Sequence, residues 1–196
     1  MTKTFVLATA ETLDDAQLVA RAIEGNRWSR EALYRRHAGY LLALSARLLA
    51  NRSEAEDVVQ DTFVTGFRQL PTLREPAALR AWLSQIAVGL VRHRIRRRRL
   101  TRLLGLDRGA DDATLAALAA PGLSAEGRVE LALVDDVLRR LRTEARIAWM
   151  LRRVEGLELA EVASLAGCSL ATAKRRIAEA DALIGAHVHG VAGEER

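Results

Sequence analysis

Leucine and alanine recur every three or four residues through two long stretches of this chain, and this spacing is the strongest constraint on its fold. Side chains three and four residues apart share one face of an α-helix, so the pattern predicts amphipathic helices. Alternating runs of Val, Ile and Thr bounded by turn residues, which are typical of strands, are missing. Proline occurs three times, at 71, 76 and 121, so it interrupts few helices. The sequence therefore predicts an all-α fold.

A segment in which the helical spacing weakens divides the chain into two periodic blocks. It mixes Gly, Pro, Asp and Ala, which indicates a flexible linker. Each block has its own apolar residues, so we expect two small helical domains, the second a helix-turn-helix domain. The expected boundaries are an N-terminal tail at 1–12, a first domain at 13–100, the linker at 101–127, a second domain at 128–188 and a C-terminal tail at 189–196.

Several classes of protein are disfavoured. Cys168 is the one cysteine, so disulfides cannot form the scaffold, and no Cys/His cluster has metal-ligand spacing. We expect His187 and His189 to be surface residues rather than zinc ligands. The sequence has no apolar run suited to a signal peptide or membrane span, and no phosphate-binding-loop, G-x-S-x-G or H-E-x-x-H motif. We therefore expect a cytoplasmic protein, neither an enzyme nor inserted in a membrane, with no metal and no other cofactor.

Positive charge is concentrated in one stretch. The chain has 30 Lys+Arg against 25 Asp+Glu, and seven of its arginines lie in VRHRIRRRRLTR, from Val91 to Arg102, without an acid among them. Such a run attracts phosphates, because each neutralised phosphate releases condensed counterions. Arginine also stacks on unpaired bases. The run therefore predicts contact with nucleic acid.

An acidic stretch, SEAEDVVQDTF at 53–63, stands out in this basic chain. Ser53 and Glu56 predict a capping box at the start of a helix, whose positive end favours acids. A cap and a solvated face explain the first acids of the stretch, but they leave Gln60 and Asp61 unexplained. Helical spacing places Ala55, Val59, Thr62, Phe63 and Gly66 on one side of this helix, and Glu54, Asp57 and Asp61 on another.

The segment LELAEVASLAGCSLATAKRRIAEADALI, at 157–184, has the form of a helix-turn-helix. Gly167 tolerates positive φ in the turn, and Ser169 can cap the second helix. Hydroxyl, amine and guanidinium groups on one side of that helix suit a major groove. The alternative is an amphipathic hairpin with a solvated basic face. The apolar side holds Leu170, Ala173, Ile177, Ala180 and Ile184, and the polar side holds Thr172, Arg175, Arg176 and Glu179, with Lys174 at its flank.

Three stretches, in order, resemble bacterial RNA polymerase sigma factors of the extracytoplasmic-function (ECF) group. EALYRRHAGYLLALSARLLANRSEAEDVVQDTFVTGFRQL resembles the first conserved region, LRAWLSQIAVGLVRHRIRRRR the stretch after it, and LRRLRTEARIAWMLRRVEGLELAEVASLAGCSLATAKRRIAEA the promoter-binding domain. The strings A-E-D-x-V-Q-D-x-F and W-L-x-x-I-A make the match specific. The resemblance implies a transcription initiation factor that binds core polymerase, recognises an upstream element with its helix-turn-helix and melts a downstream element. The alternative is a helix-turn-helix regulator that binds DNA and never contacts polymerase.

The resemblance also implies roles for individual residues. In the family, the helix that matches the acidic stretch docks on the clamp coiled coil of the largest polymerase subunit. This assigns Asp57, Gln60 and Asp61 to polymerase binding. Family members are often held by an anti-sigma factor, so such an inhibitor is a further implied partner. The residues implied for promoter DNA are Arg74, Glu75, Arg92, His93, Arg94, Arg96 and Arg97 at the downstream (−10) element, and Ser169, Thr172, Lys174, Arg175 and Arg176 at the upstream (−35) element.

Two features leave alternatives open. Gly89 and His93 stand where relatives usually carry Asn and Asp, so the downstream sequence preference is open. Trp82 lies in an apolar stripe, which favours core packing over stacking on a base. The linker acids would either mimic an RNA backbone inside the polymerase or form part of a solvated tether; they are Asp107, Asp111 and Asp112.

Overall fold

The structure, a computed structural model, describes residues 13–105 and 124–194, and every regular element in these residues is helical. The predicted all-α fold is confirmed. No helix in the described residues is both long enough and apolar enough to cross a bilayer. The first block contains α2 (Asp15–Ile23), α3 (Arg27–Leu49), α4 (Arg52–Gln69), the short 3-10 turns η1 (Leu70–Thr72) and η2 (Pro76–Ala78), and α5 (Leu79–Leu103). The second block contains α6 (Ala125–Arg140), α7 (Thr143–Arg153), α8 (Leu159–Leu165) and α9 (Leu170–Glu194).

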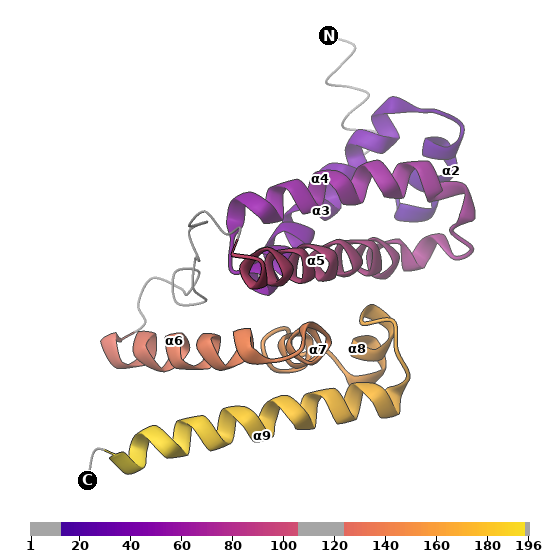
Figure 1. The fold of residues 1–196 in the computed structure, drawn as a ribbon. Helices are drawn as coiled ribbons and strands as arrows, with labels where there is room; N and C mark the ends of the chain where they lie inside the picture. Colours follow the sequence, from indigo (N-terminus) through magenta and orange to yellow (C-terminus); the bar gives the residue numbers. More distant parts are fainter. Residues whose placement is uncertain (1–12, 106–123, 195–196) are drawn as a thin grey trace.

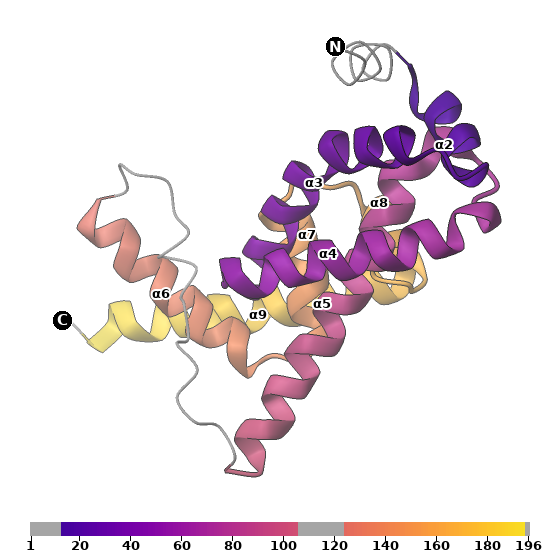
Figure 2. The same ribbon diagram turned by 90° about the horizontal axis from the view of Figure 1, so that it is seen from above.

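The two blocks lie one above the other (Figure 1). In the first block α3 packs against α4 and α5, and in the second α9 packs against α6, α7 and α8. The helix α5 forms the floor of the first block, where it contacts α7 and α8. Seen from above, the last turns of α5 extend past α3 and α4 (Figure 2). The arginine-rich end of α5 is therefore the part that its own block covers least.

The core of the first block follows the helical spacing of the sequence. Leu33, Leu41, Leu44 and Leu48 are all buried on α3. The ring of Phe63 on α4 packs 4.7 Å, centroid to centroid, from that of Tyr34. The whole apolar side predicted for α4 is buried, together with Val58, and consists of Ala55, Val59, Thr62, Phe63 and Gly66.

The predicted capping box at Ser53 and Glu56 is wrong. Ala50 ends α3 in the left-handed conformation, at φ 52°, and Asn51 is extended and caps α4. The Glu54 amide donates to Oδ1 of Asn51 at 2.9 Å. Since α4 begins at Arg52, Ser53 already lies inside the first turn. Glu56 pairs with Arg52 instead, one turn earlier on the same helix.

Helices extend into both ends of the expected linker at 101–127. α5 continues to Leu103, and α6 begins at Ala125, where Ser124 caps it by accepting from the Gly127 amide at 3.0 Å. The linker acids, Asp107, Asp111 and Asp112, lie outside the described residues, as does the expected N-terminal tail at 1–12. At the other end α9 continues to Glu194, into the range assigned to the C-terminal tail.

The helix-turn-helix is confirmed as α8, a turn and α9. Gly167 has φ 60°, a conformation that residues with a Cβ rarely adopt. The Ser169 hydroxyl accepts from the Thr172 amide at 3.2 Å and caps α9, as predicted. Leu170 was expected on the buried side but is 46% exposed, because it opens the first turn of α9 before that helix reaches its neighbours. The predicted apolar side of α9 is buried at Ala173, Ile177 and Ala180, and Ile184 is partly buried.

Two glycines allow a matched test of this packing. A Cβ at Gly89, on the exposed side of α5, would meet nothing within 4 Å, whereas at Gly66 it would stand 2.9 Å from Cδ2 of buried Leu83 and 3.6 Å from Trp82. Gly89→Ala should therefore stabilise the protein by about 0.5–1 kcal/mol through helix propensity. Gly66→Ala should be destabilising, because overpacking typically costs about 1–3 kcal/mol. Urea denaturation followed by circular dichroism measures both; equal effects would contradict the packing of Trp82 and Leu83 around Gly66.

Candidate polymerase and nucleic-acid interfaces

The acidic face of α4 is held outward by the apolar face opposite it. Thr62 is buried, and its hydroxyl donates to the Val58 carbonyl at 2.7 Å, so this polar residue does not disturb the packed side. Asp57, Gln60 and Asp61 all lie on the exposed side. The structure thus brings the three predicted polymerase-binding residues together on one surface.

Two arginines of α5 connect that surface to the neighbouring helix. Arg94 donates to Oδ2 of Asp57 at 3.3 Å and to Oδ2 of Asp61 at 3.0 Å. One turn further, Nε of Arg98 donates to Oε1 of Glu54 at 3.0 Å. We call these contacts the α4–α5 ion-pair ladder. The arginines are four residues apart on α5 and the acids three and four residues apart on α4, a spacing that is visible in the sequence, although the sequence does not show which helices are neighbours.

The ladder leaves the acids available to a partner. The side chains of Asp57 and Asp61 remain 63% and 54% exposed, and ion pairs this exposed contribute about 0–1 kcal/mol. Arg94 is only 25% exposed, so it lies beneath the two carboxylates rather than in front of them. A basic partner could therefore approach the outer side of both acids. Arg94, which the resemblance assigns to promoter DNA, also contacts the acidic face in this structure.

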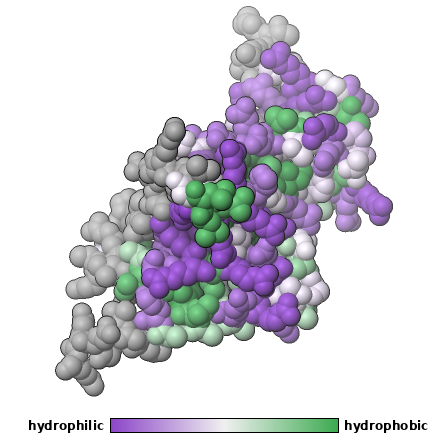
Figure 3. All heavy atoms as spheres, in the orientation of Figure 1, coloured by the Kyte–Doolittle hydropathy of each residue, from purple (hydrophilic) through white to green (hydrophobic). Residues whose placement is uncertain are grey.

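The residues predicted to bind the downstream element are distributed around α5 and its preceding loop. His93, Arg96 and Arg97 are exposed, whereas Arg92 is partly buried against the second block. On the face drawn in Figure 3, hydrophilic residues dominate around a hydrophobic patch at the C-terminal end of α5. That end carries three exposed leucines: Leu100, Leu103 and Leu104.

Arg74 and Glu75 lie at the other end of the helix. Both are exposed in the loop between η1 and η2, which is shaped by amide-to-carbonyl bonds from Leu73 to Leu70 and from Ala78 to Glu75. At 1.5 Å per residue, Arg92 lies about 20 Å along α5 from Leu79, where the helix begins. The loop and the arginines therefore do not form one compact cluster, but lie at two ends of an elongated surface.

The recognition helix of the second block presents the predicted polar side. Ser169, Lys174 and Arg175 are exposed, and Thr172 and Arg176 are partly exposed. α9 is held to α7 by Asp181, whose carboxylate accepts from Nε1 of Trp149 at 2.9 Å and from Nη2 of Arg153 at 2.7 Å. The bond from Arg153, with a smaller contribution from Trp149, lowers the pKa of Asp181 despite its partial burial. Sequence reasoning did not identify this anchor.

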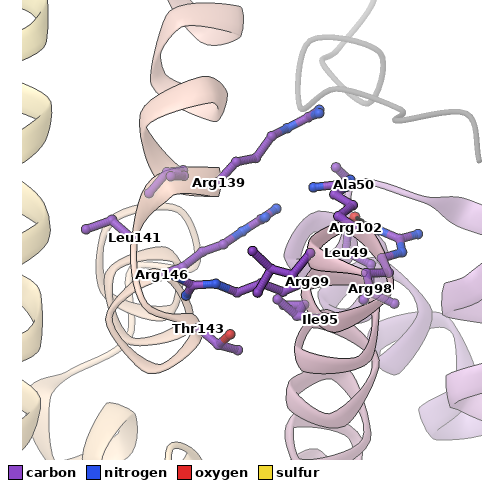
Figure 4. Close-up of a pocket in the computed structure, with 12 residues that line it drawn as sticks. Leu49, Ala50, Ile95, Arg98, Arg99, Arg102, Arg139, Leu141, Thr143 and Arg146 are labelled. Carbon is purple, nitrogen blue, oxygen red and sulfur yellow. Dashed lines mark hydrogen bonds between the residues drawn. The ribbon is translucent and has the colours of Figure 1, made fainter. Parts of the chain in front are cut away.

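Five polar contacts between described residues join the two blocks, and one of them is a bond from Nη2 of Arg146 on α7 to the Leu48 carbonyl on α3 at 3.4 Å. Figure 4 shows Arg146 extending from α7 toward α5, at a cavity that both blocks line. Arg47 on α3 forms a bidentate ion pair with Glu155, just after α7, and the Glu155 side chain is 7% exposed. Nη2 of Arg92 donates to the Ala166 carbonyl at 2.7 Å. The Gln85 amide donates to the Ser164 hydroxyl at 2.8 Å, and Arg96 pairs with Glu144 at the start of α7. Of the α5 residues predicted to bind DNA, Arg92 therefore contacts the helix-turn-helix and Arg96 contacts α7.

Glu144 is attracted by basic residues of both predicted DNA surfaces. Burial would raise the pKa of Glu144, but hydrogen bonds from Arg96 and from the backbone, with attraction from Arg96 and Arg176, hold it below the usual range. Glu144 is therefore charged at neutral pH in this arrangement. Because its pKa is depressed, the stabilisation it contributes is present above the ordinary glutamate pKa and is lost as the pH falls through the depressed value.

Two family models match the chain, one within each helical block. Residues 33–101 match the family model described as Sigma-70 region 2, and residues 131–180 match the one described as Sigma-70, region 4. The RNA polymerase sigma factor CnrH of Cupriavidus metallidurans is 33% identical over 88% of this chain and 93% of its own length. The ECF RNA polymerase sigma factor SigM of Mycobacterium tuberculosis is 32% identical over 86% of this chain and 81% of its own length.

Solved structures share the arrangement of helices. CnrH, in complex with the cytosolic domain of CnrY, matches 90% of this chain and 97% of its own with a TM-score of 0.59 and 28% identity. The sigma factor RpoE, in complex with the anti-sigma factor NepR from Bartonella quintana, matches 77% of this chain and 91% of its own. Its TM-score is 0.55 at 23% identity, a likeness that concerns the fold.

The contact between the blocks can be tested by exchanging charges at Arg47 and Glu155. Glu155→Arg places like charges together and should remove roughly 1–3 kcal/mol of the coupling between blocks. The radius of gyration from small-angle X-ray scattering should then rise, and Arg47→Glu combined with Glu155→Arg should restore it. Glu158→Arg is the matched control, because Glu158 is 78% exposed and pairs with Arg152 of its own block. A radius unchanged by Glu155→Arg would show that this pair does not hold the blocks together.

Proposed function

The chain belongs to the ECF group of bacterial RNA polymerase sigma factors, and we propose on this basis how its surfaces divide the work of initiation. It is a transcription initiation factor that binds core polymerase and directs it to promoters. The observation that carries this function is the presence of sigma regions 2 and 4, in order, on two helical blocks. Each block presents the charged surface that its part of the work requires.

The acidic face of α4 is the proposed docking surface for core polymerase. Asp57, Gln60 and Asp61 would meet basic residues on the clamp coiled coil of the largest subunit. Charge complementarity of this kind accelerates encounter and selects orientation more than it adds affinity. The position of Arg94 beneath the acids supports this assignment, because it keeps their outer side open to a partner.

The basic surfaces are the proposed contacts to promoter DNA. The N-terminal turns of α9 would enter the major groove of the upstream element, with Ser169, Thr172, Lys174, Arg175 and Arg176 at the interface. The loop before α5 and α5 itself would hold the melted downstream strand, through Arg74, Glu75, Arg92, His93, Arg94, Arg96 and Arg97. Melting needs no covalent chemistry, since contacts to the separated strand can offset the few kcal/mol per step that unstacking costs.

Promoter binding requires the two blocks to separate. Arg92 and Arg96, proposed to contact the downstream element, are occupied by Ala166 and Glu144 of the second block. Glu144 also attracts Arg176 of the recognition helix. The arrangement described here is thus the proposed resting form, and polymerase would stabilise an open form in which both DNA surfaces are accessible.

A regulatory protein is a proposed further partner. The structure of the relative CnrH contains the cytosolic domain of CnrY, and it matches nearly this whole chain. A protein that covered the acidic face of α4 and the basic face of α5 together would block polymerase and DNA at once. The proposed site of action is the cytoplasm, where core polymerase and the chromosome are found.

Reconstitution separates this function from that of a helix-turn-helix regulator. Core polymerase, the purified chain and a genomic promoter library are combined, and transcript starts are sequenced. Starts at a shared promoter motif, absent when the chain is omitted, are expected. If the chain binds DNA but never alters the start sites of core polymerase, the regulator is the correct alternative.

Asp61→Arg should weaken binding to core polymerase at least tenfold, because it reverses a charge on the docking face. The new arginine would also lie against Arg94, the partner of Asp61. Surface plasmon resonance with immobilised core enzyme measures the affinity, and circular dichroism checks the fold. Asp136→Arg is the matched control: Asp136 is also an exposed aspartate in an ion pair with an arginine, here Arg140 of the same helix. Equal affinities for Asp61→Arg and the control would remove the docking assignment.

Arg176→Ala should reduce holoenzyme binding to duplex carrying the upstream element about tenfold or more, since one arginine contact is worth roughly 1–3 kcal/mol. The affinity for core polymerase should not change. Fluorescence anisotropy across a salt series shows whether Arg176 contacts a phosphate. Loss of one phosphate contact makes the fall of log affinity with log salt concentration less steep by about 0.9. Arg140→Ala, at an exposed position of α6, serves as the control. A defect in holoenzyme assembly would instead make Arg176 a structural residue.

A further inference from the structure

The helix α2 lies beside the loop that carries Arg74 and Glu75. Both ribbon views show it next to the connection from α4 to α5 (Figure 1, Figure 2). Leu70 and Leu79, on either side of this loop, are buried. The apolar side of α2 is buried as well, and it consists of Leu18, Val19 and Ala22. α2 therefore forms part of the packed layer beneath the loop.

The hydrogen bonds of the loop do not fix the distance between its ends. The Leu73 amide donates to the Leu70 carbonyl at 3.1 Å and closes η1, and the Ala78 amide donates to the Glu75 carbonyl at 2.9 Å and closes η2. Among the described residues no hydrogen bond joins η1 to η2. α4 leads directly into η1 and α5 follows η2, whereas α2 contacts both turns from outside. The position of α2 therefore helps to set how the two turns lie relative to each other.

α2 depends on α3 for its own position. It has nine residues, and isolated helices shorter than about 12–15 residues are marginal in water. Asp14 caps it by accepting from the Gln17 amide at 2.8 Å. At the other end the Ala22 carbonyl accepts from Nε of Arg30, on α3, at 3.1 Å. Contacts with α3 thus hold the end of α2 that its own cap does not.

Asp15 joins the N-terminal end of α2 to α3. Its Oδ1 accepts from Nη1 of Arg36 at 2.7 Å, and its Oδ2 lies 3.0 Å from Nε2 of His37. A carboxylate can only accept, so Nε2 of His37 carries the hydrogen of this bond. The His37 side chain is 7% exposed, and burial lowers its pKa although Asp15 opposes this effect. We call Asp15, Arg36 and His37 the Asp15 cluster.

We propose that α2 positions the loop for the downstream element, and that Asp15 is a positioning residue that acts through α2 on Arg74 and Glu75. This inference rests on the proposed function, in which the loop holds the melted strand. The match to Sigma-70 region 2 begins at residue 33, so the matched residues do not include α2. No residue proposed to bind polymerase or DNA lies on this helix. Its contribution is therefore the placement of the loop rather than a contact with a partner.

A randomised promoter tests this placement. The downstream element of a promoter found by the reconstitution is randomised, and the preference of the holoenzyme is measured as the ratio of starts from intact elements to starts from substituted ones. Asp15→Ala should lower this ratio at least fivefold, as should Arg74→Ala, while the preference for the upstream element stays the same. A general loss of stability would lower all starts together and leave the ratio unchanged.

Matched variants separate positioning from charge. Glu31→Ala removes the same charge from α3, where Glu31 pairs with Arg35 one turn later, and should change the ratio no more than about twofold. Asp15→Glu keeps the carboxylate and should restore most of the preference. Arg30→Gln, which weakens the hold on Ala22 at the other end of α2, should act in the same direction as Asp15→Ala.

Hydrogen exchange of the purified chain gives a second readout that needs neither polymerase nor promoter. The amides of Leu73 and Ala78, which close the two turns, should exchange at least fivefold faster in Asp15→Ala, because local opening becomes more frequent when a packed neighbour is released. Glu31→Ala should leave both rates unchanged.

Two results would overturn the inference alone. One is an unchanged downstream preference in both Asp15→Ala and Arg30→Gln while Arg74→Ala lowers it, which would show that the loop acts without α2. The other is an equal effect of Glu31→Ala, which would reduce the result to charge. If the unaltered chain shows no downstream preference at all, the proposed function fails and this inference fails with it.

Discussion

The rest of the structure depends on how the positive charge of the α5 arginines is balanced. One helix presents these arginines to three different environments. On one side Arg94 and Arg98 meet the acids of α4. On another, Arg92 and Arg96 reach the second block. His93 and Arg97 remain exposed between them. A helix with this much positive charge is stable here because carboxylates and backbone carbonyls from both blocks surround it. The ion pairs of Arg94 with exposed Asp57 and Asp61 are weak enough to exchange for contacts with a partner.

This arrangement would link the proposed polymerase-binding face to the proposed DNA-binding face through neighbouring residues. The same Arg94 that positions Asp57 and Asp61 lies one turn from Arg98, which pairs with Glu54. Contacts made by Arg92 and Arg96 with the second block cover a surface proposed for the downstream promoter. A resting form in which the two blocks cover each other's DNA surfaces would limit binding to chromosomal DNA in the absence of polymerase. Binding of core enzyme would then have to favour separation of the blocks.

Much of the fold could be predicted from the sequence, because helical periodicity depends on neighbours only three and four residues apart. The apolar sides of α3 and α4 were predicted in this way, whereas the turn at Gly167 and the cap at Ser169 were predicted from the chemistry of those residues. The cap of α4 was not, since Ala50 adopts a left-handed conformation that moves the start of the helix to Arg52. The exposure of Leu170 was missed because it depends on where α9 meets its neighbours. The contacts of Arg47 and Arg92 join residues more than seventy positions apart, and no local pattern reports such pairs.

Separation of the two blocks is the claim on which this account depends, and holding them together tests it most directly. Gln85 and Ser164, which are hydrogen-bonded across the contact, are replaced by cysteine in a Cys168→Ser background. A short bis-methanethiosulfonate reagent then joins them, and dithiothreitol removes it. Promoter-dependent transcription by core polymerase should be lost in the joined protein and should return on reduction, with both single-cysteine proteins unaffected. Full initiation by the joined protein would contradict the account, because the DNA surfaces would then function without the blocks separating.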